Sequence, residues 1–126
     1  MTFSTEIKNP KIFDLLFNEA QNAETIQTSR HSSAIVYKKQ VIGVGRNSRK
    51  THPLSVKFNG ATKPCIHAEL AAIISVVNNY GADILKKCDI YCLRITNTDK
   101  VAIAKPCDGC SKAILAFGIR RTFYTV

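Results

Sequence analysis

Cys65-Ile66-His67-Ala68-Glu69 and, later in the chain, Pro106-Cys107-Asp108-Gly109-Cys110 are the two stretches around which the other segments can be interpreted. His67 and Glu69 are two residues apart, which would place them on different sides of a helix body. They converge only if a helix begins there, and Pro64 just upstream favours such a start. Cys107 and Cys110 are three residues apart, so both sulfur atoms lie on one face of another helix's first turn. The two stretches therefore predict two helix N-termini that supply one site.

This predicted site contains one imidazole and two thiolates, from His67, Cys107 and Cys110. Three ligands of N, S and S type suit tetrahedral zinc and leave its fourth position to water. The positive end of a helix dipole lowers the pKa of a thiol and so favours the thiolate that binds metal. Zinc lowers the pKa of a bound water toward about 7, and Glu69 is placed to move the protons. We therefore expect a Zn²⁺ cofactor.

Helical and strand patterns alternate along the chain, which predicts an α/β fold. Asn9-Pro10 opens a helix over about 10–22, and residues 34–37 and 41–44 form a hairpin. The segment from Asn47 to Pro64 carries glycine, proline and positive charge, so we predict a loop. Pro64 opens a buried helix that ends near 78–81. A strand follows over 89–95, and residues 101–104 extend its pairing. The last two elements are a helix from Pro106 to Gly118 and a strand over 121–126.

Composition favours one domain over residues 1–126. The hydrophobic fraction of 45% suits a single core, and no apolar run approaches the roughly 20 residues that a membrane helix needs. Five cysteines is an odd number, and two of them form the Cys-x-x-Cys, which favours a reduced compartment over a disulfide framework. We therefore expect a cytoplasmic protein without a membrane partner, in which Cys88 and Cys92 are core residues.

The formal net charge of +9 points to an anionic partner, either a nucleotide or nucleic acid. Positive charge is concentrated between Arg46 and Lys63, a segment without Asp or Glu. Because this segment precedes the proposed catalytic helix, it should pass near the mouth of the pocket. Arg46, Arg49 and Lys50 are the expected phosphate contacts. Arg30 and His31 are weaker candidates.

His-x-Glu followed by Pro-Cys-x-x-Cys is the signature of zinc nucleobase deaminases. From Ala34 to Tyr124 the sequence resembles the cytidine/deoxycytidylate deaminase superfamily. The run from Pro106 to Ile114, followed by Gly118-Ile119-Arg120-Arg121-Thr122-Phe123-Tyr124, is most similar to the deoxycytidylate branch, and His67-Ala68-Glu69-Leu70-Ala71-Ala72-Ile73 fits it too. The resemblance implies a three-layer α/β/α fold with a mixed sheet of 4–5 strands. Many relatives continue through a further helix and strand, so we expect a shortened sheet with an edge that an oligomer partner or a different topology must cover.

The resemblance also implies a role for each matching residue. His67, Cys107 and Cys110 would bind zinc, and Glu69 would carry protons from the attacking water to the base and to the leaving ammonia. The backbone N–H of Ala68 would bind the base, and Asn47 would bind the sugar. The expected reaction is hydrolytic deamination of a cytosine nucleotide such as deoxycytidylate, by a chain that forms a homo-oligomer.

Several alternatives stay open at this point. The same chemistry could act on single-stranded DNA, on RNA, or on a nucleoside or another base. A closed structural zinc site of Cys65, His67, Cys107 and Cys110 would instead make the chain a non-catalytic binding module. A redox pair of Cys107 and Cys110 would leave His67 and Glu69 unexplained.

Overall fold

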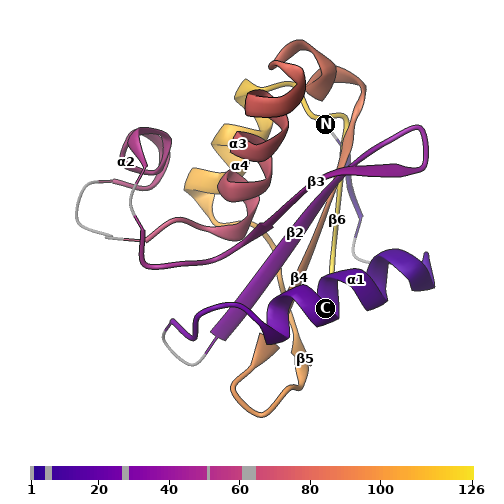
Figure 1. Cartoon of the computed structure of the whole chain (residues 1–126), viewed down its shortest axis with the longest axis vertical. Coiled ribbons are helices and arrows are strands. Elements are labelled where there is room, and N and C mark those ends of the chain that lie inside the picture. Colours follow the sequence, from indigo (N-terminus) through magenta and orange to yellow (C-terminus); the bar gives the residue numbers. More distant parts are fainter. Residues whose placement is uncertain (1, 5–6, 27–28, 51, 61–64) are drawn as a thin grey trace.

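The computed structural model describes residues 2–4, 7–26, 29–50, 52–60 and 65–126. Figure 1 shows three layers: α1 covers one face of a central sheet, and α3 and α4 cover the other. The predicted α/β/α architecture is therefore confirmed. The elements are, in chain order, β1 (Thr2–Ser4), α1 (Pro10–Gln21), β2 (Ser29–Tyr37), β3 (Gln40–Arg46), α2 (Pro53–Asn59), α3 (Ala68–Tyr80), the 3-10 helix η1 (Asp83–Lys87), β4 (Asp89–Thr96), β5 (Val101–Ala102), α4 (Asp108–Ala116) and β6 (Arg121–Tyr124).

The sheet is mixed, as predicted, with the strand order β1-β6-β4-β2-β3 and with β5 added beside β4. β2 pairs antiparallel with β3 and β4, while β4 is parallel to β6. β5 pairs with Arg94 and Ile95, beyond the part of β4 that pairs with β6. β1 runs parallel to β6 on its other side. The sheet edge that we expected to need cover is thus covered, along β6, by a segment of the same chain.

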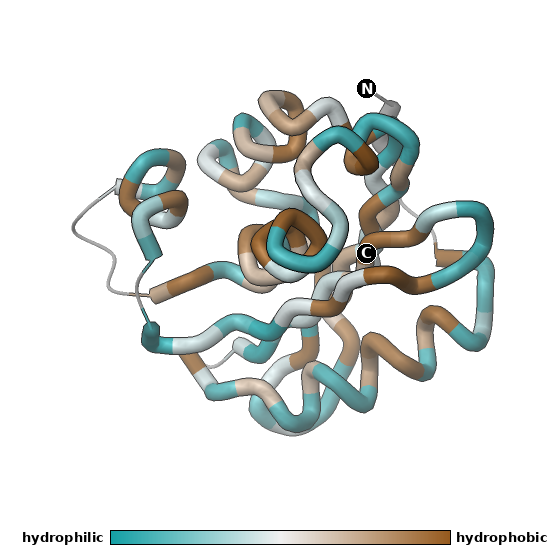
Figure 2. The backbone as a smooth tube through the Cα atoms, turned by 45° about the horizontal axis from the view of Figure 1, so that its top comes forward, coloured by the Kyte–Doolittle hydropathy of each residue, from teal (hydrophilic) through white to brown (hydrophobic). Residues whose placement is uncertain are grey.

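Two hydrophobic cores lie on opposite faces of the sheet. Ile12, Leu16 and Ala20 of α1 are four residues apart and pack against the first face. α3 packs against both the sheet and α4 on the second face, which explains why it is apolar almost all round. Cys88 and Cys92 are buried in this second core, as expected. Figure 2 shows hydrophilic residues concentrated in the turns between elements.

The structure corrects the prediction that residues 47–64 form one loop, because Pro53–Asn59 form α2. His52 caps this helix by accepting a hydrogen bond from the Leu54 N–H at its Nδ1, over 3.1 Å. Histidine is not among the preferred capping residues, so Pro53 at the first helical position was the one usual start signal for this helix. Pro64, expected to open the next helix, lies outside the described residues. The helix that it precedes, α3, begins at Ala68.

The other boundaries differ by smaller amounts. The strand predicted over 34–37 is β2 and begins earlier, at Ser29. α4 begins at Asp108 rather than at Pro106. No described helix combines the length and apolar character that crossing a membrane requires.

α3 lies on β3 with almost no space between the two backbones. A Cβ atom built on Gly45 would lie 2.3 Å from both the Ala68 carbonyl oxygen and the Ala72 nitrogen. A Cβ atom on Gly43 would lie 2.4 Å from Cγ2 of Val76. Because glycine has no side chain, it permits this approach. β3 therefore fixes the position of the N-terminal half of α3.

Gly45→Ala is expected to lower the free energy of unfolding by about 3 kcal/mol, because its methyl group meets backbone atoms that cannot rotate away. Gly43→Ala should cost less, since its shortest contact is with a side chain. Urea unfolding of both variants beside the parent chain measures the difference. Equal losses would show that the backbone approach at Gly45 is not the tighter constraint.

Candidate metal centre and active site

The N-termini of α3 and α4 bring His67, Cys107 and Cys110 together. His67 is the N-cap of α3, Cys107 is the N-cap of α4, and Cys110 lies in the first turn of α4. His67 Nδ1 is 3.3 Å from the Cys110 sulfur and 3.5 Å from the Cys107 sulfur. The three donor atoms all lie within 4.8 Å of one another. The two helix starts converge as the sequence predicts.

These donors fit zinc in type and in spacing. Tetrahedral bonds of about 2.3 Å to sulfur and about 2.0 Å to nitrogen would separate the donor atoms by about 3.5 Å. Among the described His, Cys, Asp and Glu residues, this trio is the group that could hold a metal ion. Cys65 is among the residues that the structure describes, but it is not part of this trio. This argues against the closed zinc site that Cys65 would form with His67, Cys107 and Cys110.

The two thiols of the trio hold one proton between them. A hydrogen bond from Cys110 lowers the pKa of Cys107 to about 3, and His67 acts in the same direction. The same contact, together with burial, raises the pKa of Cys110. A cation that displaced this shared proton would therefore meet one sulfur that is already a thiolate.

Asn59, at the end of α2, contacts both sulfur atoms and was not identified from the sequence. Its Nδ2 donates to the Cys110 sulfur at 3.8 Å, and its Oδ1 lies 3.4 Å from the Cys107 sulfur. Gly109 permits this contact, because a Cβ atom there would lie 2.0 Å from Asn59 Oδ1. The unpredicted helix α2 thus supplies a polar neighbour that orients the sulfur ligands.

Glu69 lies in the first turn of α3 with only 7% of its surface exposed. Burial raises the pKa of its carboxyl group above the ordinary value, and a hydrogen bond from its own backbone N–H opposes this effect. A buried carboxyl group with a raised pKa is suited to accepting and returning a proton near neutral pH. His67, Cys107 and Cys110 all affect this pKa, so the carboxyl group lies near the three donors.

A cavity of about 770 Å³ opens over Glu69, Ala68, His67 and Cys107. This volume lies within the range of about 300–1,000 Å³ that is typical of small-molecule sites. Glu69 is the one carboxylate among its described lining residues. The rest of the lining consists of Ile26, Ser29, His31, Asn47, Arg49, Cys65, Ile66, Arg94, Ile103, Ala104 and Lys105.

Asn47, Ala68 and Arg49 line this cavity as expected. Asn47 is buried, and its amide already serves the backbone: Oδ1 accepts from the His31 N–H at 2.7 Å, and Nδ2 donates to the Glu24 carbonyl at 3.0 Å. One N–H and one lone pair of that amide are left for another partner. Arg49 is 70% exposed and donates to the Thr25 carbonyl.

Arg46 and Lys50 do not line the cavity, contrary to expectation. Successive residues of a strand point to opposite faces, so Arg46 at the end of β3 points away from the cavity that Asn47 lines. Its Nε pairs with Glu19 on α1 at 2.5 Å. Lys50 follows four residues after Arg46 and is exposed.

Arg94 and Lys105 line the cavity, and the sequence did not identify them. Arg94 on β4 donates from Nε to the Ser29 hydroxyl at 2.9 Å and from Nη1 to the Ile103 carbonyl at 3.3 Å. Its presence in an otherwise apolar strand is the signal that could have indicated a site residue. His31 contributes no charge at neutral pH, because burial and then Arg94 lower its pKa to about 4.

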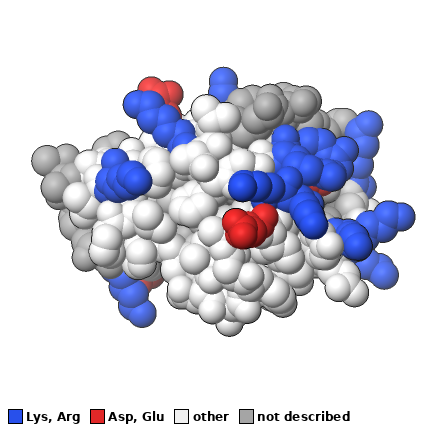
Figure 3. Space-filling view, turned by 90° about the horizontal axis from the view of Figure 1, so that it is seen from above, with Lys and Arg blue, Asp and Glu red and all other residues white. Residues whose placement is uncertain are grey.

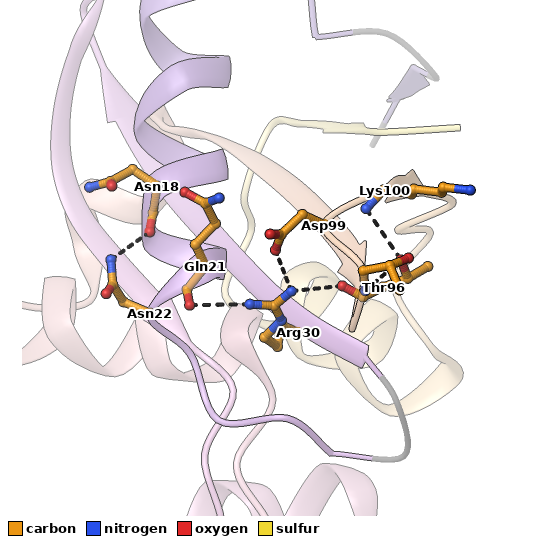
Figure 4. Close-up of polar contacts among 8 residues, drawn as sticks. Asn18, Gln21, Asn22, Arg30, Thr96, Asp99 and Lys100 are labelled. Atoms are coloured by element: carbon orange, nitrogen blue, oxygen red, sulfur yellow. Dashed lines mark hydrogen bonds and ion pairs between the residues drawn. The ribbon is translucent and has the colours of Figure 1, made fainter.

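Arg30, a weaker candidate for a phosphate contact, instead stabilises one wall of the cavity through hydrogen bonds. Figure 4 shows its guanidinium group between the end of α1 and the β4–β5 turn. It donates to the Gln21 carbonyl at 3.3 Å, to the Thr96 carbonyl at 2.8 Å, and to Asp99. The segment after this turn carries Ile103 and Lys105, so Arg30 helps to fix the position of both lining residues.

Known structures share this architecture. Guanine deaminase from Bacillus subtilis is 21% identical with a TM-score of 0.60, and the match covers 94% of this chain and 64% of that one. The deoxycytidylate deaminase of cyanophage S-TIM5 is 19% identical with a TM-score of 0.60, covering 92% and 83%. A tRNA:A34 deaminase is 23% identical with a TM-score of 0.59, covering 90% and 73%. These identities are low, so the likeness establishes the fold.

A comparison with curated protein sequences finds no match. The family model described as the cytidine and deoxycytidylate deaminase zinc-binding region matches residues 7–126. That range contains the His, Cys and Glu residues of the site and all of the elements that position them. The chain therefore belongs to the cytidine and deoxycytidylate deaminase zinc-binding family.

Proposed function

We propose that this protein is a zinc-dependent hydrolase that deaminates a cytosine nucleotide, releasing ammonia and the uracil nucleotide. The observation that carries the proposal is the buried carboxyl group of Glu69, which faces a cavity beside an imidazole and two thiols. A purely structural metal site would need neither the buried acid nor the cavity above it.

Each residue of the site has a separate role in the proposed reaction. His67, Cys107 and Cys110 would hold zinc, which lowers the pKa of a water molecule toward about 7. Glu69 accepts a proton from the attacking water and passes it to the ring nitrogen. It then takes the second proton of that water, from the hydroxyl group now on the ring carbon, and gives it to the departing amine, which leaves as ammonia. The backbone N–H of Ala68 donates to the base. Water thereby replaces the exocyclic amine, and the buried surroundings of Glu69 limit the loss of protons to solvent.

A nucleotide is favoured over a nucleoside by the charges that line the cavity. Arg49, Arg94 and Lys105 are cationic, and Glu69 is the one carboxylate among the described lining residues. Arg94 uses two of its five N–H donors in its contacts with Ser29 and Ile103. A phosphate group could therefore receive charge-assisted hydrogen bonds there.

Deamination within a nucleic acid is the second candidate. The net charge of +9 and the exposure of Arg49 at the cavity favour it, because both suit a phosphodiester backbone. A panel of cytidine, deoxycytidine, their phosphates, guanine and adenine compounds and short oligonucleotides, scored for ammonia release, distinguishes the candidates. Turnover of oligonucleotides but not of monomers would overturn the nucleotide proposal.

Cys107→Ala and His67→Ala are expected to lose stoichiometric zinc, because either change leaves two of the three donors. Cys65→Ala should keep one zinc per chain, since Cys65 lies outside the trio. Metal analysis of purified variants measures this. Loss of zinc from Cys65→Ala would favour the closed structural site.

Glu69→Gln is expected to keep zinc but to lower kcat by about 10³-fold, because the amide cannot accept and return the proton. Ammonia release, measured on protein with verified metal content, tests this. An active Glu69→Gln enzyme would refute the role assigned to Glu69.

Arg94→Gln is expected to raise KM for a cytosine nucleotide by about tenfold, through loss of a charge-assisted contact. KM or activity for the matching nucleoside should change little. Lys57→Gln, an exposed lysine on α2 that does not line the cavity, is the charge-matched control. A parallel loss with nucleotide and nucleoside would mean that Arg94 only supports the wall.

A further inference from the structure

A second cavity, of about 460 Å³, lies at the opposite end of the sheet from the metal donors. It is formed where β2 turns into β3, where β4 and β6 begin, and where α1 begins. Its lining contains Lys38, Lys39, Lys87, Arg120 and Arg121, with Asn9, Ile12, Val36, Tyr37, Asp89 and Tyr91. Figure 3 shows Lys and Arg side chains crowded together on the side where Figure 1 has the β2–β3 turn.

The charge of this lining is strongly unbalanced. Five side chains are cationic, and Asp89 is the one carboxylate among the described lining residues. Asp89 is engaged by the two arginines: Arg121 donates to its two oxygens at 3.1 and 2.8 Å, and Arg120 lies 3.6 Å away. The described lining holds no second carboxylate that could pair with the three lysines. The cavity therefore presents an excess of positive charge that the proposed deaminase reaction does not use.

The turn that carries two of the lysines has an unfavourable backbone conformation. Lys38 and Lys39 have φ angles of 47° and 67°, both in the left-handed region. Two-residue turns of this kind favour Asn-Gly, because residues with longer side chains are strained there. Strained residues of this kind cluster at functional sites. Lysine at both positions therefore suggests that the charge itself has a use.

The start of α1 adds to the positive potential. Asn9, the N-cap of this twelve-residue helix, lines the cavity. A helix N-terminus carries a partial positive charge that favours anions. Lysines, guanidinium groups and a helix start thus surround one hollow.

We propose that this cavity binds a small molecule that carries a chain of two or more phosphate groups. One phosphate would engage only part of this set of cations, whereas a phosphate chain can reach the three lysines and also the two arginines that share Asp89. A nucleic acid strand fits less well, because strand binding uses open aromatic faces. Here Tyr91 is stacked on Phe123 at 4.7 Å, and the Lys38 ammonium lies over the Tyr37 ring.

The test titrates inorganic tripolyphosphate, orthophosphate and a short single-stranded oligonucleotide into the zinc-loaded chain by calorimetry, with zinc content measured afterwards. Tripolyphosphate is expected to bind about tenfold more tightly than orthophosphate, because it engages more of the cations. Similar affinities for the two phosphates would overturn the proposal. So would tighter binding of the oligonucleotide than of tripolyphosphate, which would indicate a strand-binding surface.

The decisive variant is Lys38→Asn with Lys39→Gly. It should weaken tripolyphosphate binding by about tenfold, because two cations are lost. It should also leave Tm without ligand unchanged or raised, because the new residues suit the left-handed turn. A merely structural role of the lysines would lower Tm instead. The charge-matched control, Lys57→Gln with Lys100→Gln, removes two lysines that do not line this cavity and should keep full affinity.

Two further variants locate the site. Lys87→Gln with Arg120→Gln should also weaken tripolyphosphate binding, and it decides the matter if the turn variant folds poorly. Arg94→Gln, at the other cavity, should leave this affinity unchanged. The proposal would be overturned if the Lys87 and Arg120 variant bound tripolyphosphate with full affinity. It would also be overturned if Arg94→Gln were the variant that lost this affinity.

Discussion

The close approach of α3 to β3 is the constraint on which the site depends. Gly45 brings the backbone of the strand against the first turns of the helix, which also carry Ala68 and Glu69. A metal centre tolerates little displacement, because its ligand atoms must lie within a few tenths of an ångström of their bonding distances. The imidazole of His67 is set by the start of α3, while both sulfurs are set by the start of α4. Any shift of one helix relative to the other would therefore separate one ligand from the other two.

The cavity over this centre has two parts with different origins. The reactive end is built from helix starts, where backbone geometry determines how side chains point. The other end is a basic wall that carries Arg94 of β4 and Lys105 of the segment after β5. Arg30 fixes the position of this wall through hydrogen bonds to the Thr96 carbonyl and to Asp99. Because the two parts come from different segments, the residues of the wall can vary while the residues that would carry out the reaction stay the same.

Local rules explain which features were predictable. The two helix starts follow from the short spacings of His67 with Glu69 and of Cys107 with Cys110, so each could be predicted without knowledge of the packing, and the donor types suited to zinc indicated that they meet. Strand alternation also excludes Arg46 from the face that Asn47 uses, although only the structure shows which of the two faces the cavity. Asn59 and Arg94 reach the site through tertiary packing, from α2 and from the middle of the sheet. The sequence could not indicate Asn59, because its role depends on contacts between segments that are distant along the chain, whereas Arg94 stands out in the sequence as a charged residue inside an apolar run.

The net charge of +9 was interpreted from the sequence as one signal for an anionic substrate, but the structure has a group of cationic side chains at each of two ends of the sheet. β2 links them, since His31 lines the cavity over Glu69 and Val36 lines the cavity beside Asp89. Five residues of extended strand span about 17 Å. Exposed charges interact weakly beyond a Debye length of about 8 Å at physiological salt, so the two groups of cations act almost independently. Positive charge at the β2–β3 turn therefore does little to hold a substrate over Glu69, and its presence there calls for a ligand of its own.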